Sequence, residues 1–244
     1  MKKQSNYTSD LAKVHHSDYS DLAESAALTA IEYLRSKSVS NGLIIDLGCG
    51  SGVTAQILTA AGYDVIGVDY SKDILKIAKK HAPGATFICQ SIFDFTIPKC
   101  EAVLSIGEVF NYAFDNRVNK PMLQNIFSRV YNALKPGGLF LFDVLTPGTL
   151  GTDNYRKRII ETHDYTMFLK VEENTDEKTL TRDICLFTRQ NDLYRKTRET
   201  HQQKLYKVAE VEKSLDSAGF EYKVFQKYKK YTLRNCHIGF LCTK

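Results

Sequence analysis

The sequence predicts an α/β protein with a parallel central sheet and an inserted antiparallel β segment. Between residues 43 and 144, short apolar runs alternate with helix-like segments, and this order requires the crossover connections of a parallel sheet. Beyond Pro147 the segments become rich in Thr, Tyr, Phe and Arg, with partial alternation of apolar and polar residues. Of the 244 residues, 43% are hydrophobic and 25% are charged, which excludes wholesale disorder and collagen-like repeats.

The first half of the chain is expected to form a helical segment followed by strand–helix units. Apolar residues at helical spacing over 10–36 predict two helices with a break near Ser17. A helix is expected after each of the first two strands, over 53–61 and then behind a Ser71 cap. A further helix runs from Pro121 to Leu134, where Lys135-Pro136-Gly137-Gly138 ends it. The five predicted strands are LIIDLG (43–48), DVIGVD (64–69), ATFIC (85–89), AVLSIG (102–107) and LFLFDV (139–144).

The second half is expected to add a β insertion and to close the sheet. Alternating segments separated by turn-like stretches predict three antiparallel strands, at 164–173, 178–189 and 192–204. A helix over 207–218 ends at Gly219, and strands at 221–230 and 236–243 are expected to pair as a hairpin. The expected organisation is an N-terminal helical cap (1–36), a core (37–147 and 207–244) and an antiparallel β lid (148–206).

Charge, cysteines and hydropathy restrict the surroundings of the protein. The formal charge is +5, and residues 1–150 hold 14 basic and 14 acidic residues, whereas 151–244 hold 19 and 14. Such an excess fits either an acidic partner such as RNA or an ordinary solvated surface. The six cysteines show no CxxC pair and no zinc-ligand spacing, which predicts reduced thiols and no metal site. No apolar run is long enough for a membrane helix, and no apolar signal segment follows the first lysines. We therefore expect a cytoplasmic protein without a membrane partner.

The stretch DLGCGSG, from Asp46 to Gly52, carries the chemistry. It lies between a buried strand and a helix, and its glycines let the backbone turn tightly beside a ligand. The dinucleotide fingerprint G-x-G-x-x-G needs a third glycine where Val53 stands, so that fingerprint fails. Asp69 follows 17 residues after Gly52, at the end of the second strand. An acid there can accept hydrogen bonds from ribose hydroxyls. By itself Asp69 fits a helix cap as well, but together with the glycine loop it predicts a nucleoside ligand.

These two motifs, with LKPGG at 134–138, resemble the class I S-adenosylmethionine-dependent methyltransferases over roughly residues 40–145. The resemblance implies a Rossmann-like seven-stranded sheet whose last strand is antiparallel, with the cofactor across the carboxyl ends of the first two strands. Gln90-Ser91-Ile92 stands where many members have Gly-Asp, so Ser91 replaces the usual acid at the adenine. Carried over to this chain, the cofactor-binding residues are Asp46, Gly48, Cys49, Gly50, Ser51 and Gly52 for the methionine part, Asp69 for the ribose, Tyr70, Ser91, Ile92 and Phe93 around the adenine, and Gly107.

The end of the fourth strand argues against two subclasses that methylate nucleic-acid bases. Glu108-Val109-Phe110 does not match the Asn/Asp-Pro-Pro-aromatic motif of many amino-nitrogen methyltransferases. Pro98-Lys99-Cys100 precedes the fourth strand, which is the wrong place for a cytosine C5 nucleophile. Glu108, Asn111 and Tyr112 occupy the position of the family's active-site loop, although Asn111 and Tyr112 fit a loop-capping role equally well.

Two outlying segments complete the candidate site. Glu199, His201 and Tyr206 match an E-x-H-x-x-x-x-Y stretch in a group of small bacterial methyltransferases, including cyanobacterial-type members, with a β insertion after the fifth strand. Strand alternation places Glu199, His201 and Gln203 on one face, where the Glu–His pair fits either a base or a structural contact. The segment DLAKVHH (10–16) resembles a helix that, in the family, closes over the methionine end of the cofactor. In this segment His15 stands where relatives often have Tyr. The candidate general bases are His201, Glu108 and His15, in that order.

The leading expectation is S-adenosylmethionine-dependent methyl transfer to a small-molecule acceptor by in-line displacement, in a monomer or homodimer. Alignment of nucleophile, methyl and sulfur supplies most of the catalysis in such a reaction. The alternatives are a methyltransferase that acts on tRNA, rRNA or protein, with nucleic acid less favoured, a non-catalytic S-adenosylmethionine-binding protein, and an NAD-dependent dehydrogenase.

Overall fold

The computed structural model describes residues 10–12, 14, 20–113 and 120–244. Its centre is a seven-stranded sheet in the order β10-β13-β5-β4-β1-β2-β3. The strands are β1 (Leu43–Leu47), β2 (Asp64–Asp69), β3 (Thr86–Cys89), β4 (Cys100–Ser105), β5 (Leu134–Leu145), β10 (Glu221–Phe225) and β13 (His237–Thr243). Strands β1 to β5 pair in parallel, and β13 is antiparallel to both β5 and β10. The α/β class and the seven-stranded sheet with an antiparallel last strand are therefore confirmed.

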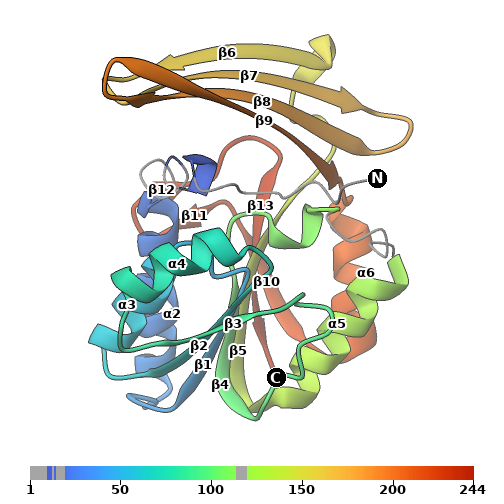
Figure 1. Ribbon diagram of the computed structural model, residues 1–244. Coiled ribbons are helices and arrows are strands. Elements are labelled where there is room, and N and C mark those ends of the chain that lie inside the picture. Colours follow the sequence, from blue (N-terminus) through green and yellow to red (C-terminus); the bar gives the residue numbers. More distant parts are fainter. Residues whose placement is uncertain (1–9, 13, 15–19, 114–119) are drawn as a thin grey trace.

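Helices cover both faces of this central sheet (Figure 1). On one face lie α2 (Ser20–Ser36), α3 (Val53–Ala60) and α4 (Lys72–His81), and on the other lie α5 (Lys120–Ala133) and α6 (Val208–Ala218). The apolar core is accordingly divided in two. Phe127, Phe140 and Phe142 pack between the sheet and α5, and Leu34 and Leu58 pack on the opposite face. Because β1 lies between β2 and β4, the order in which the strands are added reverses there, and the carboxyl ends of these parallel strands form the expected ligand edge.

A second, four-stranded antiparallel sheet lies across that edge (Figure 1). We call it the insertion sheet; it consists of β6 (Tyr155–Glu161), β7 (Tyr165–Asn174), β8 (Thr179–Gln190) and β9 (Leu193–Lys204), in that order. The expectation of three strands was wrong because β6 was missed. Arg156, Lys157 and Arg158 stand in its middle, and almost every residue of β6 is exposed, so the strand lacks the apolar alternation that marks its neighbours.

The expected pairing of the two closing strands is confirmed, but the first of them, expected at 221–230, already ends at Phe225. Between β10 and β13 the chain forms a separate ribbon of two short strands, β11 (Lys227–Tyr228) and β12 (Tyr231–Thr232). Tyr228 is completely buried against Phe225. The burial of the Tyr228 ring therefore accounts for the end of β10 at Phe225, where the expected strand would have continued. Among the described residues, no helix has both the length and the apolar character needed to cross a membrane.

Candidate cofactor and acceptor site

The glycine loop after β1 adopts a backbone that only glycine tolerates well. Gly48, Gly50 and Gly52 have φ angles of 75°, 53° and 81°, in the left-handed region. The amides of Gly48 and Cys49 both donate to the Val68 carbonyl of β2, over 2.7 and 3.1 Å. A Cβ added to Gly48 would lie 2.5 Å from a methyl carbon of Val109. The loop is thus held between β2 and the short helix η1 (Val109–Asn111) that follows β4.

Asp69 connects this loop to the end of β2. Its carboxylate accepts hydrogen bonds from the Gly50 amide (3.1 Å) and the Ser71 amide (2.8 Å). Burial raises the pKa of Asp69, and these backbone hydrogen bonds oppose the rise. A carboxylate has about four lone-pair sites, so Asp69 can hold the loop and still accept hydrogen bonds from a ligand.

Asp46 lies at the base of the loop with one oxygen unsatisfied. The residue is 2% exposed, and its Oδ2 has no hydrogen-bond partner among the described residues. Burial, and secondly the charge of Asp69, raise the pKa of Asp46 to about 7. Buried polar atoms without partners are rare in native proteins, so this oxygen is suited to a cation or a hydrogen-bond donor brought by a ligand.

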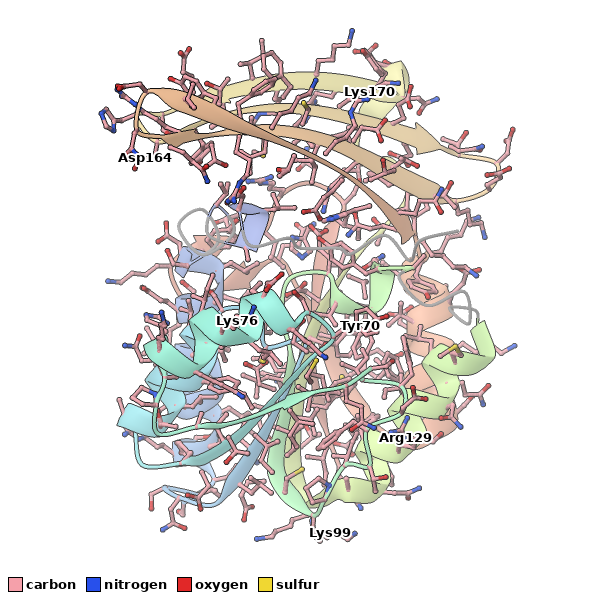
Figure 2. All side chains as sticks on the ribbon, viewed as in Figure 1. Tyr70, Lys76, Lys99, Arg129, Asp164 and Lys170 are labelled. Carbon is pink, nitrogen blue, oxygen red and sulfur yellow. The ribbon has the colours of Figure 1, made fainter. Side chains whose placement is uncertain are left out.

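The loop after β3 carries the residues expected around the adenine. The Gln90 amide donates to the Asp69 carbonyl over 3.0 Å, which joins the loop to the end of β2. Ile92 is buried, whereas Tyr70 is half exposed. Figure 2 shows Tyr70 in the half of the core nearer the insertion sheet, with Lys99 at the opposite end. From α5, Arg129 donates to the carbonyl oxygens of Phe93, over 2.7 Å, and Phe95. The candidate cofactor residues therefore gather at one end of the sheet.

A buried acid fixes the turn after β4. Asp143, on β5, accepts hydrogen bonds from the amides of Gly107 (3.0 Å) and Glu108 (2.7 Å). It also contacts the Tyr228 hydroxyl at 3.1 Å and His237 Nε2 at 2.8 Å. Burial alone would lower the pKa of His237, but the charge of Asp143 and this hydrogen bond raise it overall. A Cβ added to Gly107, whose φ is 92°, would meet no described atom within 4 Å, so the turn borders open space.

Glu108 faces the insertion sheet from this turn. Its Oε2 accepts from Arg182 Nη2 of β8 over 3.0 Å and from Gln203 Nε2 of β9 over 2.8 Å. Burial by itself would raise the pKa of Glu108. The positive charge of Arg182, followed by the charge of His237 and the hydrogen bonds from Gln203 and Arg182, lowers this pKa overall. Glu108 therefore remains an ionised carboxylate, which makes it a weak base.

The inner face of β9 adds a second acid next to a histidine. His201 Nε2 lies 2.9 Å from Glu199 Oε2, and the two residues are 2% and 3% exposed. The ring of Tyr112 packs edge-on against His201, with centroids 6.0 Å apart. Gln203 is fully buried as well, which confirms that Glu199, His201 and Gln203 share one face. The insertion sheet thus presents polar groups toward the carboxyl end of β4.

Comparison with known proteins agrees with this geometry. A family model described as a methyltransferase domain matches residues 44–138. A Bacillus subtilis protein, by name the methyltransferase YqeM, is 25% identical over 203 residues, which is 78% of each chain. The structure of an S-adenosylmethionine-dependent methyltransferase from Clostridium acetobutylicum superimposes with a TM-score of 0.81 at 20% identity, covering 95% of this chain and 97% of that one. The chain is a class I S-adenosylmethionine-dependent methyltransferase. The structure of S-adenosylmethionine-bound CalS10, an amino pentose methyltransferase from Micromonospora echinaspora, is also similar. It has a TM-score of 0.75 at 14% identity and covers 94% of this chain and 96% of that one.

The N-terminal segment of the methyltransferase contacts the insertion sheet. Asp10 pairs through both carboxylate oxygens with Arg195 of β9. Leu11 and Val14 pack against a cluster that includes Met167 of β7. His15, the third candidate base, lies outside the described residues. Among residues 10–12, 14, 20–113 and 120–244, no group of three or more His, Cys, Asp or Glu is placed to hold a metal ion.

Four residues that position the site were not foreseen from the sequence. Asp143 had a usable signal, since it is the one charged residue in the apolar strand LFLFDV, and a buried charge needs partners. Arg129, Arg182 and Arg195 had none, because each meets its partner across 34 to 185 residues of chain.

Proposed function

We propose that this methyltransferase transfers the methyl group of S-adenosylmethionine to a small-molecule acceptor bound between the carboxyl end of β4 and the insertion sheet. One observation carries the proposal. The polar groups that face this region, Glu199, His201 and Gln203, are each at most 3% exposed. An enclosed polar site suits a small acceptor, whereas an RNA or protein substrate needs an accessible surface. That CalS10 is an amino pentose methyltransferase supports the same acceptor class.

The residues present fit the cofactor. The unpartnered Oδ2 of Asp46 would receive the methionine ammonium, and the glycine loop from Gly48 to Gly52 would lie along the methionine part. Asp69 would accept from the ribose hydroxyls with the lone pairs that the loop leaves available. The residues that would surround the adenine are Tyr70, Ser91, Ile92 and Phe93. Gly107 would border the cofactor from the turn after β4. When bound, the cofactor supplies a strongly electrophilic sulfonium methyl group.

The chain itself must orient the acceptor, exclude water and remove a proton. Correct alignment can contribute roughly 7–11 kcal/mol to lowering a barrier. A positioned general base adds typically about 10²–10⁴-fold. We assign this base to His201, oriented by the Glu199 carboxylate 2.9 Å away. Glu108 is assigned a positioning role instead, because Arg182 keeps it ionised. His15 remains a candidate from the sequence.

The charge distribution gives little support to an RNA substrate. Residues 148–206, which include the insertion sheet, hold 11 basic and 10 acidic residues, whereas 207–244 hold 8 and 4. The excess therefore belongs to the closing segment, where Lys229 pairs with Glu32 of α2, and not to the sheet over the site. All six cysteines are free thiols, which suits the reducing cytoplasm, and we propose that location. For the assembly we propose a monomer or homodimer.

Acceptor screening tests the proposal. Pooled amino sugars, phenols, carboxylates and total tRNA are incubated with S-adenosylmethionine, and release of S-adenosylhomocysteine is measured. We expect release with at least one small-molecule pool and none with tRNA. Gly50→Val, which blocks the glycine loop, is the matched inactive control. Release with tRNA alone, weakened steeply by salt, would establish the RNA alternative. Cofactor binding without release on any pool would establish a non-catalytic binding protein.

A further inference from the structure

The amide of Gln203 has one satisfied end and one unsatisfied end. The side chain is fully buried on the inner face of β9. Its Nε2 donates to Glu108 Oε2 over 2.8 Å, whereas its Oε1 has no hydrogen-bond partner among the described residues. A second unpartnered buried oxygen, besides that of Asp46, is therefore present at the edge of the site.

The neighbouring charge fixes which end of the amide is unsatisfied. Amide nitrogen and oxygen atoms can be exchanged in a structure without altering its shape, so the hydrogen-bond partners must decide their positions. Glu108 is ionised, because Arg182 lowers its pKa against the effect of burial, and a carboxylate only accepts hydrogen bonds. Gln203 must therefore present its NH₂ group to Glu108. The unsatisfied atom is the oxygen, which can only accept a hydrogen bond.

The backbone holds this amide in a fixed position. Gln203 forms an isolated antiparallel bridge with Tyr112, and the Ala113 amide donates to the Gln202 carbonyl over 2.9 Å. One residue further along, the Lys204 carbonyl accepts from the Asn111 side chain over 2.6 Å. Gln203 is thus anchored to the loop after β4 through both its backbone and its side chain, so rotation away from the site would break the hydrogen bond to Glu108.

The amide that carries the unsatisfied oxygen is hydrogen-bonded to Glu108, a residue of the candidate site. Its partner Glu108 directly follows Gly107, which borders open space. His201, the proposed base, stands two residues before Gln203 on the same face, a separation of about 7 Å along a strand. A small molecule between them can contact both residues through adjacent polar groups.

We propose that Gln203 positions the methyl acceptor by accepting a hydrogen bond from an N–H or O–H group next to the atom that is methylated. This inference rests on the proposed function, and it narrows the acceptor to molecules with two neighbouring polar groups, such as vicinal amino alcohols and diols. His201 takes the proton from one group, and Gln203 Oε1 accepts from the other. Gln203 is a positioning residue whose amide selects the acceptor.

Matched acceptor pairs test the proposal. Each pair consists of an amino sugar or aminocyclitol and the analogue in which the neighbouring hydroxyl is replaced by hydrogen. We compare the wild type with Gln203→Met, which keeps the side-chain length but removes the amide. Gln202→Met is the control, because Gln202 is exposed on the opposite face of the same strand. A site built to bind a polar group rejects analogues that lack it by large factors.

We expect the wild type and Gln202→Met to prefer the hydroxyl-bearing member at least about tenfold in kcat/KM. Gln203→Met should lose this preference while its Kd for S-adenosylhomocysteine stays within about twofold of the wild type. If Gln203→Met does not fold, Gln203→Asn, which withdraws the amide by one carbon, replaces it.

Two other results overturn the inference. In the first, the preference is absent from the wild type or survives in Gln203→Met. In the second, methylation is found only with acceptors that lack a neighbouring donor, such as simple phenols. The proposed function stands in that second case, and it fails separately if no small molecule releases S-adenosylhomocysteine.

Discussion

Cofactor affinity should depend on pH through Asp46. The pKa of this buried acid is raised to about 7 before any ligand binds. If its unpartnered oxygen receives the cofactor ammonium, that positive charge stabilises the carboxylate and lowers the pKa in the complex. Binding then requires the loss of the Asp46 proton below pH 7. With one such proton, affinity falls about tenfold between pH 8 and pH 6, or about 1.4 kcal/mol.

Isothermal titration calorimetry with S-adenosylhomocysteine measures this effect. At pH 7, titrations in two buffers of different ionisation enthalpy should show release of about half a proton. Asp46→Asn should bind more weakly at pH 8 and show no slope between pH 8 and pH 6. Asp64→Asn is the control, because Asp64 is exposed at the far end of β2. Equal affinities of the wild type at pH 6 and pH 8, or an unchanged slope in Asp46→Asn, would refute the placement of the ammonium.

The stability of the free protein should show the opposite trend. An acid whose folded pKa lies above its unfolded pKa binds more protons in the folded state than in the unfolded state. Its contribution to the free energy of unfolding therefore decreases as pH rises from about 4 to about 7. Asp46→Asn should remove that decrease. An unpaired buried acid therefore predicts two opposite trends. As pH rises, the cofactor binds more tightly, and the free protein becomes less stable.

Four further changes have defined outcomes. Arg129→Met should raise the Kd for S-adenosylhomocysteine several-fold by releasing the loop after β3, with kcat nearly unchanged at saturation; an unaltered Kd would contradict this. His201→Gln should lower kcat by about 10²–10⁴-fold at constant cofactor Kd, as measured by single turnover. Arg182→Met should cost about 2 kcal/mol in urea unfolding, because Glu108 loses its counter-charge in a partly buried place, and Glu108→Gln should restore part of it. Because the pKa of His237 is raised, its stabilising effect is complete below about pH 6.5 and is lost as pH rises through the folded value; thermal melts of His237→Gln should be flatter in that range.

Much of the core could be predicted from local sequence patterns. A buried parallel strand is a short apolar run, and β1, β2 and β4 each show one. The glycine loop is recognisable because its three left-handed residues admit little else than glycine. These are short-range constraints, so one segment of sequence contains the whole signal. By contrast β6 escaped prediction because its neighbours, and not its own composition, make it a strand.

The candidate site divides in the same way. The positions of Asp46 and Asp69 could be predicted, because each acid lies at the carboxyl end of a short apolar strand. Glu108 was correctly placed at the end of β4, but its first assignment as a base could not take account of Arg182, 74 residues away. Whether a carboxylate acts as a base depends on the charges around it in the folded protein. A nearby arginine from a distant part of the chain keeps the carboxylate ionised, and its role is then to position other side chains. Sequence alone therefore finds the acid but not its role.

Strand β9 is the element that connects the two halves of the site. Near its end, Gln203 is joined to the loop after β4 by a backbone bridge and by the Glu108 contact. Near its start, Arg195 holds Asp10 of the N-terminal segment. These two points are about 27 Å apart along an extended strand. The end that carries His201 and Gln203 is thus fixed to the core and can hold an acceptor in a preset orientation. Among the described residues, the other end contacts the N-terminal segment through the Asp10–Arg195 ion pair and a small apolar cluster.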